Sequence, residues 1–417
     1  MNKYDNMKNS NLPWIKEIPS HWKITRIKEI LQNVSEKNHP NATVLSLYRE
    51  YGVLPKDSRD DNHNVTSLDT ASYKFVRTGE LVINKMKAWQ GSLGVSDYEG
   101  IVSPAYYVCH FTSDKVNPKY LHYLLRCNAY AQEFERLSTG MRIGQWDLGI
   151  DDFMCTSTLI PPLDEQTAIV SYLDEQCAKI DNLIDEIQNS IEEYKAWKTS
   201  LISETITKGL VRNIEMKESG IAWIGKIPAS WTLCKQKYVI RLINGRAYKD
   251  TEFEENGKYK VLRVGNLFTN SKWYTSSLEL DPEKYCDAGD LLYAWSASYG
   301  PCIWQGEKVI YHYHIWKTEL SQKLDKMFAY YYFIALSRSI ASESHGSAMA
   351  HVTMGNMNNS YIAYPDIKQQ MEIADYLNMK CAAIDKLISE KESILADLFD
   401  YKKSLIYEVV TGKRKVV

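Results

Sequence analysis

Few residues of this chain have types and spacings suited to chemistry, and none falls into a catalytic pattern. Tyr311-His312-Tyr313-His314 places two imidazoles two residues apart, on one face of a predicted strand, where they could bind a metal. No Cys, Asp or Glu stands nearby at a ligand spacing, so we expect these histidines to be structural or to lie at the surface. The sequence therefore predicts no metal site.

A second set of residues superficially resembles a nuclease motif. Pro365-Asp366 followed by Asp400-x-Lys402 echoes a PD…(D/E)xK arrangement. That chemistry needs the second pair on a strand beside the first, whereas Asp400 and Lys402 fall within a long helical pattern. The phosphate-binding patterns G-x-G-x-x-G and G-x-x-x-x-G-K-[ST] do not occur, nor does an Asn-Pro-Pro-aromatic motif. We predict no catalytic and no cofactor-binding residues in this chain.

The segments that must position any functional residue are written twice. Residues 14–22, WIKEIPSHW, return as residues 223–231, WIGKIPASW. Residues 166–207 align with residues 370–411, which gives a constant offset of 204 (370 minus 166). This period is far longer than the roughly 50 residues of the longest solenoid repeats. It indicates a duplicated domain-plus-helix, and hence a pseudo-twofold protein with two similar heads.

Both copies of the longer repeat read as continuous helices. Apolar residues recur at alternating steps of three and four over 169–201 and again over 373–409, without Pro or Gly. Such a stripe over about five heptads is typical of a coiled-coil seam, with each helix roughly 60–65 Å long at ~1.5 Å per residue. Lys198 and Lys402 fall on this stripe at equivalent positions. They are either packed stems with solvated ammonium groups, or a register-setting polar position or partner contact.

The heads read as mixed α/β domains. Runs of strand-forming residues predict strands at 45–48, 80–84, 105–108, 260–264, 290–293 and 309–313. Helices are expected at 119–135 and 326–342, each followed by a polar loop, at 138–144 and 344–353. The predicted fold is α+β, with two mixed α/β heads joined by two long antiparallel helices. The predicted domains are 1–163 (first head), 164–208 (central helix), 209–366 (second head with its entry linker) and 367–417 (C-terminal helix and tail).

Composition and charge narrow the class of protein. The 417 residues include eight cysteines but no CxxC pair, which favours a reducing cytoplasm. The polar N-terminus predicts no signal peptide, and the longest apolar run, 328–336, is far shorter than the ~18 residues of a membrane span. Residues 161–210 carry a net charge of −6, whereas residues 1–160 carry +1 and residues 211–364 carry +3. The heads could therefore bind DNA if a partner shared the electrostatic work.

The layout of head, long helix, head and long helix resembles the specificity (S) subunits of type I restriction–modification systems. The resemblance rests on residues 18–22 (IPSHW), their repeat 227–231 (IPASW), 160–166 (IPPLDEQ), 79–86 (GELVINKM), 289–292 (GDLL) and 261–266 (VLRVGN). The second long helix departs from the pattern. It opens with YPDIKQQ at 364–370, where no acidic residue precedes Gln370.

The resemblance implies a DNA-reading subunit that is not an enzyme by itself. Each head would be a target-recognition domain for one half of a split double-stranded DNA sequence, and the coiled coil would set the spacer. Two methyltransferase (M) subunits would supply S-adenosylmethionine chemistry. Restriction (R) subunits would supply ATP- and Mg²⁺-dependent translocation and cleavage, and no membrane is involved. The alternative is a coiled-coil scaffold that bridges two protein partners without DNA.

Polar residues of the predicted loops are the candidates for DNA contact. In the major groove, Arg or Lys distinguishes guanine, and Asn or Gln distinguishes adenine. The candidates in the first head are Arg49, Lys85, Lys87, Gln90, Arg142 and Gln145. The candidates in the second head are Arg246, Arg263, Asn266, Ser296, Ser298 and His345. The neighbouring aromatic residues are expected to support the fold rather than stack on bases: Trp89, Trp295 and Tyr299.

Overall fold

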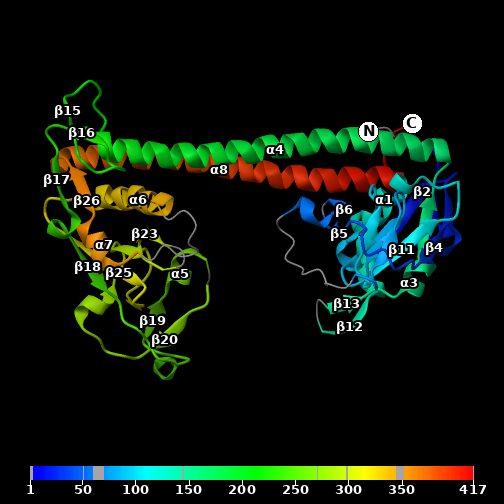
Figure 1. The fold of residues 1–417 in the computed structure, drawn as a ribbon, viewed down its shortest axis with the longest axis horizontal. Helices are drawn as coiled ribbons and strands as arrows, with labels where there is room; N and C mark the ends of the chain where they lie inside the picture. The colour runs from blue at the N-terminus through cyan, green and yellow to red at the C-terminus, as the bar shows by residue number, and fades with distance from the viewer. Residues whose placement is uncertain are drawn as a thin grey trace. The chain divides into compact units, whose positions relative to one another are not determined.

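The computed structural model describes residues 3–49, 51–59, 70–142, 145–269, 271–296, 299–343 and 352–416. The chain divides into two compact units, each combining one head with segments of both long helices (Figure 1). Unit 1 comprises Met1–Gln188 and Ser393–Val417, and unit 2 comprises Asn189–Glu392. The duplication in the sequence is therefore a duplication of structural units.

The elements that begin in the first head are short strands and helices followed by one long helix. They are β1 (Met7–Leu12), β2 (Ile15–Pro19), β3 (Lys23–Arg26), β4 (Leu31–Val34), β5 (Leu45–Tyr48), β6 (Gly52–Pro55), β7 (Lys74–Val76), β8 (Leu81–Asn84), β9 (Leu93–Val95), β10 (Gly100–Val102), β11 (Tyr106–Phe111), α1 (Pro118–Arg126), α2 (Asn128–Leu137), β12 (Thr139–Arg142), β13 (Gln145–Asp147), α3 (Ile150–Cys155), β14 (Ser157–Ile160) and α4 (Leu163–Lys208).

The second head repeats this plan. Its elements are β15 (Met216–Glu218), β16 (Lys226–Pro228), β17 (Thr232–Lys235), β18 (Ile240–Asn244), β19 (Tyr259–Leu262), α5 (Val264–Phe268), β20 (Tyr274–Ser276), β21 (Tyr285–Cys286), β22 (Leu291–Ala294), β23 (Gly300–Ile303), β24 (Val309–Tyr311), β25 (Ile315–Leu320), α6 (Lys326–Glu343), α7 (Met354–Asn359), β26 (Tyr361–Tyr364) and α8 (Ile367–Val410).

The two heads share one antiparallel sheet and differ beyond it. The shared four-stranded sheet has the order β4-β11-β8-β9 in unit 1 and β18-β25-β22-β23 in unit 2. Unit 2 adds a second four-stranded sheet, β20-β19-β24-β21, in which β19 and β24 run parallel. Unit 1 instead has the two-stranded sheets β5–β6, β7–β10 and β12–β13. The α+β prediction is confirmed, and the divergence lies away from the shared sheet.

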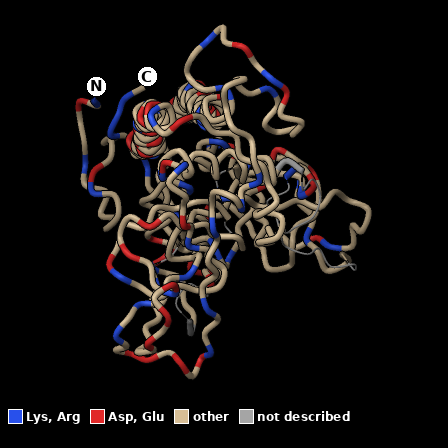
Figure 2. Tube along the Cα trace, turned by 90° about the vertical axis from the view of Figure 1, so that its left-hand side faces the viewer, with Lys and Arg blue, Asp and Glu red and all other residues tan. Residues whose placement is uncertain are grey.

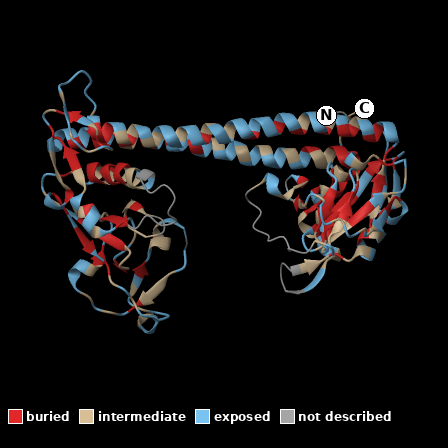
Figure 3. Ribbon diagram, in the orientation of Figure 1, coloured by how far each residue is buried: buried red, intermediate tan, exposed pale blue. Residues whose placement is uncertain are grey.

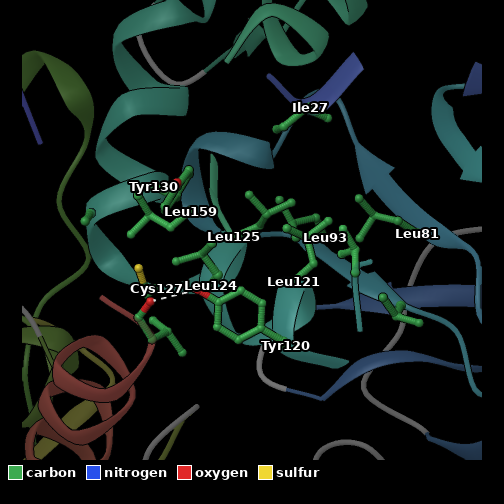
Figure 4. Close-up of a cluster of buried hydrophobic side chains, with 14 of the residues drawn as sticks. Ile27, Leu81, Leu93, Tyr120, Leu121, Leu124, Leu125, Cys127, Tyr130 and Leu159 are labelled. Carbon is green, nitrogen blue, oxygen red and sulfur yellow. Dashed lines mark hydrogen bonds between the residues drawn. The ribbon is translucent and has the colours of Figure 1, made fainter. Parts of the chain in front are cut away.

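The hydrophobic core of unit 1 joins the head to the C-terminal end of α8. Helix α1 begins at Pro118, and the Asn117 side chain caps it by accepting a bond from the Lys119 amide (3.0 Å). Its apolar face packs in the buried cluster drawn in Figure 4. Within that cluster the Tyr120 hydroxyl donates to the carbonyl of Val410, near the end of α8, at 3.2 Å. The end of α8 therefore belongs to the core of this head.

Two predictions about the helix and loop of the first head are wrong. The helix expected at 119–135 is broken at Cys127, whose backbone is extended (φ −66°, ψ 154°), into α1 and α2. Both short helices bury their apolar faces in the same core, so tertiary packing outweighs helix propensity here. The loop expected at 138–144 is instead mostly part of the β12–β13 hairpin.

Two strand predictions in the second head extend too far. The strand expected at 260–264 ends at Leu262, because Val264 opens the short helix α5. The strand expected at 309–313 ends at Tyr311. His312 to His314 therefore lie at the turn between β24 and β25 rather than on a strand, which corrects the expected setting of the two histidines. Of the polar loop expected at 344–353, residues 344–351 lie outside the described ranges.

A buried glutamine fixes the start of each long helix to its head. Gln166 and Gln370 are both 0% exposed. The amide of Gln166 donates to the carbonyls of Lys115 and Pro161 (both 2.9 Å), and its oxygen accepts from the Asn117 amide (2.8 Å). Gln370 makes the equivalent bonds to Lys323, Pro365 and Asp325, each at 2.8 Å. The glutamine of the repeat thus joins the first turn of the long helix, called the helix root below, to the head in both units.

The far end of each helix docks on the repeated tryptophan. Helix α4 stops before Gly209 (φ +73°) and α8 before Gly412 (φ +71°), and this left-handed backbone favours glycine. A Cβ at Gly209 would lie 3.1 Å from the ring of Trp231, and one at Gly412 would lie 3.1 Å from the ring of Trp22. The two long helices therefore end in the same way, once in each unit.

The two lysines on the helical stripe form reciprocal ion pairs. In unit 2, Lys198 of α4 contacts both carboxylate oxygens of Asp385 in α8 at 2.6 Å. In unit 1, Lys402 of α8 contacts those of Asp181 in α4 at 2.6 and 2.7 Å. The partners are equivalent under the 204-residue offset, since Asp181 corresponds to Asp385. This geometry favours a register-setting polar position over solvated ammonium groups.

Candidate nucleic-acid interface

In the first head, three candidate residues share the turn that follows β8. Lys85, Lys87 and Gln90 lie in the β8–β9 connection, where Lys87 is exposed. The Lys85 ammonium contacts the Asp147 carboxylate at 2.8 Å, and the Lys85 carbonyl accepts a bond from the Leu148 amide at 2.9 Å. These contacts tie the turn to the end of the β12–β13 hairpin.

That hairpin carries two further candidates. Arg142 and Gln145 face each other across it as paired residues, on strands rather than in a loop. Their side chains lie outside what the structure describes. The hairpin is braced against the turn by Trp89 and Trp146, whose rings meet edge to face at 5.2 Å. The sequence reasoning thus selected two segments that the fold brings together.

The charge of this region is partly neutralised. The hydrogen bond that Lys85 donates to Asp147 is the main reason that the pKa of Lys85 is raised, so the lysine is cationic but paired. Arg49, the sixth candidate, lies exposed in the turn between β5 and β6. Its carbonyl accepts a bond from the guanidinium of Arg126, which also donates to the Leu93 carbonyl on β9 (2.6 Å). That second turn is therefore held to the shared sheet.

In the second head, two candidates line a pocket of about 250 Å³. The lining residues come from the β19–α5 junction, the segment before and into β20, and the β24–β25 turn: Arg263, Val264, Gly265, Asn266, Lys272, Tyr274, His312 and His314. Sequence reasoning missed Lys272, Tyr274 and the histidines as members of this site. Only the H-x-H spacing signalled the histidines, and their approach to Arg263 depends on strand pairing between distant segments.

The remaining candidates of the second head differ in how their groups are used. The guanidinium of Arg246 donates two hydrogen bonds to the carboxylate of Glu252 (2.6 and 3.1 Å). These bonds are the main reason that the pKa of the Glu252 carboxyl is lowered. Arg246 therefore braces its own loop. Ser296 is half-buried just beyond β22. Ser298 and His345 lie outside the described residues.

The two histidines of the pocket are held neutral. Burial, followed by the proximity of His314 and Arg263, lowers the pKa of His312 to about 4. Burial and Arg263 also lower the pKa of His314. Their ring centroids are 4.8 Å apart. Within the described part of the chain, no group of three or more His, Cys, Asp or Glu side chains could hold a metal ion.

Basic and acidic residues are interspersed along the described trace, as Figure 2 shows. The local pairing of cations with carboxylates in both heads agrees with that distribution. Cations without an acidic partner are therefore the informative ones, because a paired cation offers little net charge to a phosphate.

A second candidate surface lies on the long helices, where much of each helix is exposed (Figure 3). Three pairs of large apolar side chains are exposed at equivalent positions of the repeat. Leu163 and Ile367 are 46% and 37% exposed, Leu183 and Leu387 are 47% and 39% exposed, and Trp197 and Tyr401 are both 51% exposed. Each unit thus presents exposed apolar residues of both α4 and α8. Exposed apolar groups that recur in this way indicate a protein-binding surface.

Among the residues that the structure describes, no helix combines the length and the apolar character needed to cross a bilayer.

Comparisons with known proteins agree on one family. The model of the type I restriction modification DNA specificity domain matches residues 19–193 and again 228–393. The type I restriction enzyme MjaVIII specificity subunit of Methanocaldococcus jannaschii is 25% identical over 424 residues, which cover 96% of this chain and 94% of that protein.

Two solved structures share the fold. A chain from a study of complex assembly and conformational transition of the type I R-M system has a TM-score of 0.74 at 15% identity, covering 95% of this chain and 99% of that one. The HsdS subunit of Thermoanaerobacter tengcongensis has a TM-score of 0.50 at 16% identity, covering 95% of this chain and 98% of that one. At these identities the likenesses establish the fold alone.

Proposed function

Because the chain belongs to the family of type I restriction–modification DNA specificity domains, we propose that it selects the DNA target of such a system, with each head reading one half of a bipartite site. The observation that carries this proposal is the contrast within the repeat. The shared sheet, the glutamine at the helix root and the glycine at the helix end recur, whereas the segments carrying the candidate contacts differ. A common frame with two different reading surfaces suits an asymmetric DNA sequence.

The two long helices act as the spacer in this proposal. Helix α4 continues from unit 1 into unit 2, and α8 returns from unit 2 to unit 1, so both units hold an antiparallel helix pair. The reciprocal pairs Lys198–Asp385 and Lys402–Asp181 support a fixed register between the helices. A fixed register would give a fixed number of base pairs between the half-sites.

The exposed apolar residues of α4 and α8 support docking of two methyltransferase subunits. Leu183 and Tyr401 belong to unit 1, while Leu387 and Trp197 are their repeat equivalents in unit 2. Two equivalent surfaces on one chain suit two copies of one partner. The −6 charge of residues 161–210 gives that partner an acidic surface to recognise.

The chemistry of modification and cleavage belongs to the partners in this proposal. Methyltransferase subunits bring S-adenosylmethionine, and restriction subunits bring ATP and Mg²⁺. We expect the chain alone neither to methylate nor to cut DNA. The eight cysteines all have free thiols, which suits the reducing cytoplasm where such a complex would meet DNA.

Methylome sequencing of a host that expresses this chain with its methyltransferase partner tests the proposal. We expect methylation at one bipartite sequence with a constant gap. Methylation without sequence preference would contradict the proposal. The alternative of a scaffold that bridges two proteins without DNA is disfavoured by the family match, and it predicts no gel shift of any duplex by the complex.

A further inference from the structure

The pocket of unit 2 contains two cations that have no acidic partner. Arg263 and Lys272 are exposed, and neither forms an ion pair with a residue that the structure describes. Two other lysines of this head are neutralised by carboxylates. Lys260 contacts Glu307 at 2.6 Å, and Lys317 contacts Asp290 at 2.7 Å. No Asp or Glu is among the residues that line the pocket, so its positive charge is available to a ligand.

The two cations are pre-positioned. The guanidinium of Arg263 lies 5.1 Å from the ring centroid of Tyr274, and the ammonium of Lys272 lies 5.4 Å from the same centroid. Asn266 closes the segment between them, since its oxygen accepts from the Arg263 amide (3.1 Å) and its nitrogen donates to the Lys272 carbonyl (2.8 Å). Little conformational freedom would be lost when an anion binds.

The imidazoles add neutral donors to the same cavity. His312 and His314 are half-buried. None of their ring nitrogens has a hydrogen-bond partner within the described ranges. A neutral imidazole carries one N–H donor, which can bond to an anionic oxygen. The pocket thus offers both charge and donors.

This set of groups suits a phosphate better than an extruded base. A base would need a free aromatic face on which to stack. The ring of Tyr274 is already packed by Phe253, at a centroid distance of 4.7 Å, and by both cations. Arginine and lysine without carboxylates are the usual partners of phosphate oxygens.

We propose that this pocket binds one backbone phosphate of the target DNA through Arg263 and Lys272, with His312 and His314 donating to its oxygens. The inference rests on the proposed function and assigns this part of unit 2 a positioning role. Phosphate contacts set the register of a protein on DNA without reading sequence. Loss of the pocket should therefore weaken binding to cognate and unrelated DNA by the same factor.

The first test measures how the affinity of the complex with its methyltransferase partner depends on salt. We expect the Arg263→Gln/Lys272→Gln double variant to lower the slope of log K against log[salt] by about 0.9, the value for one phosphate neutralised on duplex DNA, and each single variant to lower it by part of that amount. Lys260→Gln is the matched control, because it removes the same charge from a lysine paired with Glu307, and its slope should not change. Unchanged slopes in both pocket variants would overturn the proposal, and so would relaxed preference at one base.

The second test uses wild-type protein and replaces single phosphates of the half-site by neutral methylphosphonates. At one position, the methylphosphonate should weaken DNA binding by the wild type but should not weaken binding by the Arg263→Gln/Lys272→Gln variant any further. If no position behaves so, the pocket does not hold a DNA phosphate. Inorganic phosphate at constant ionic strength should weaken DNA binding by the wild type more than by the double variant, whereas phosphate that binds the pocket without competing with DNA would show a site for free phosphate. A wild-type complex without sequence preference would refute the proposed function itself, which is a separate outcome.

Discussion

Units 1 and 2 share their scaffold but not their reading surfaces. Each has a buried glutamine at the helix root, a glycine stop packed on a tryptophan and a lysine–aspartate pair between the helices. They differ where unit 1 places the β12–β13 hairpin and where unit 2 has its second sheet and the pocket at Arg263. The elements that recur are those to which the proposed function assigns identical partners, and the elements that diverge are those to which it assigns DNA contacts.

The scaffold itself is not perfectly symmetric. Glu165 of unit 1 accepts bonds from the indole of Trp22 (3.1 Å) and from His21 (2.8 Å), besides the hydroxyl of Tyr4. Its equivalent in unit 2 is Gln369, which is exposed. The departure from the family pattern at 364–370 thus removes an anchor for the segment before the head, while Gln370 keeps its own role.

The largest effect is expected from lengthening the helix pair. Four residues inserted after both Asn189 and Ser393, which are exposed, add ~6 Å to each helix. At ~3.4 Å per base pair, the gap between half-sites should grow by one or two base pairs while both half-sites stay the same. Methylome sequencing measures the gap. An active variant with the original gap would show that the helices are not the spacer.

Replacing the root glutamines should destabilise one unit at a time. Gln166→Leu leaves one amide and two carbonyls of unit 1 without their buried partner, and Gln370→Leu does the same in unit 2. Unsatisfied buried groups cost about 1–3 kcal/mol each, so we expect a loss near 3 kcal/mol. Hydrogen exchange should show faster opening in the mutated unit alone. Equal loosening of both units would mean that the glutamines do not act within their own head.

Acid should lower the stability of unit 1 through a histidine that takes no part in the proposed DNA contacts. His122 accepts a bond at Nδ1 from the Val95 amide (3.1 Å), and burial, then Arg126 and Lys119, lower its pKa to about 3. The unfolded chain takes up this proton near pH 6.5, so stability falls as pH drops from there towards 3, by about 2 kcal/mol at pH 5.

The matched variant for this prediction is His122→Asn, which keeps an acceptor for the Val95 amide but does not titrate. Its free energy of unfolding should change less between pH 7 and pH 5 than that of the wild type. Denaturant titrations at the two pH values measure the difference. Identical pH dependence in both proteins would show that His122 is already protonated or solvated in the native state.

The smallest effect is expected at the reciprocal ion pairs. Lys198 and Asp385 are partly exposed, as are Lys402 and Asp181, so each pair should contribute about 0.5–1 kcal/mol. Double-mutant cycles with alanine at both members give each coupling energy. The two cycles should agree if the units share one scaffold. A coupling energy found in one unit but not in the other would break the symmetry claimed here.

Much of the frame was predictable from the sequence because it repeats and because its patterns are local. The stripe of apolar residues identified both long helices. The break at Cys127 was not predictable, since it depends on how two helices share one core. The meeting of Arg263 with His312 and His314 was equally hidden, because the parallel pairing of β19 with β24 creates it.

The candidate contacts show the same division. Lys85, Lys87 and Gln90 are candidates because of their side-chain types and lie close together in the sequence, and the fold adds the hairpin of Arg142 and Gln145 through distant contacts. Asn266 has the residue type of an adenine reader, yet its amide is engaged with its own loop. The residue type indicates which side chains could contact DNA. Whether a side chain is available for that contact depends on the hydrogen bonds and ion pairs that it already forms within the protein.

Exchanging one head separates the shared scaffold from the DNA-reading surfaces in a single experiment. Residues 24–159 are replaced by the equivalent segment of another family member, and the methylome is sequenced with the same methyltransferase partner. We predict that one half-site changes, while the other half-site and the gap remain. If both half-sites change, the two heads do not read DNA independently, and the contrast between a shared scaffold and separate reading surfaces is wrong.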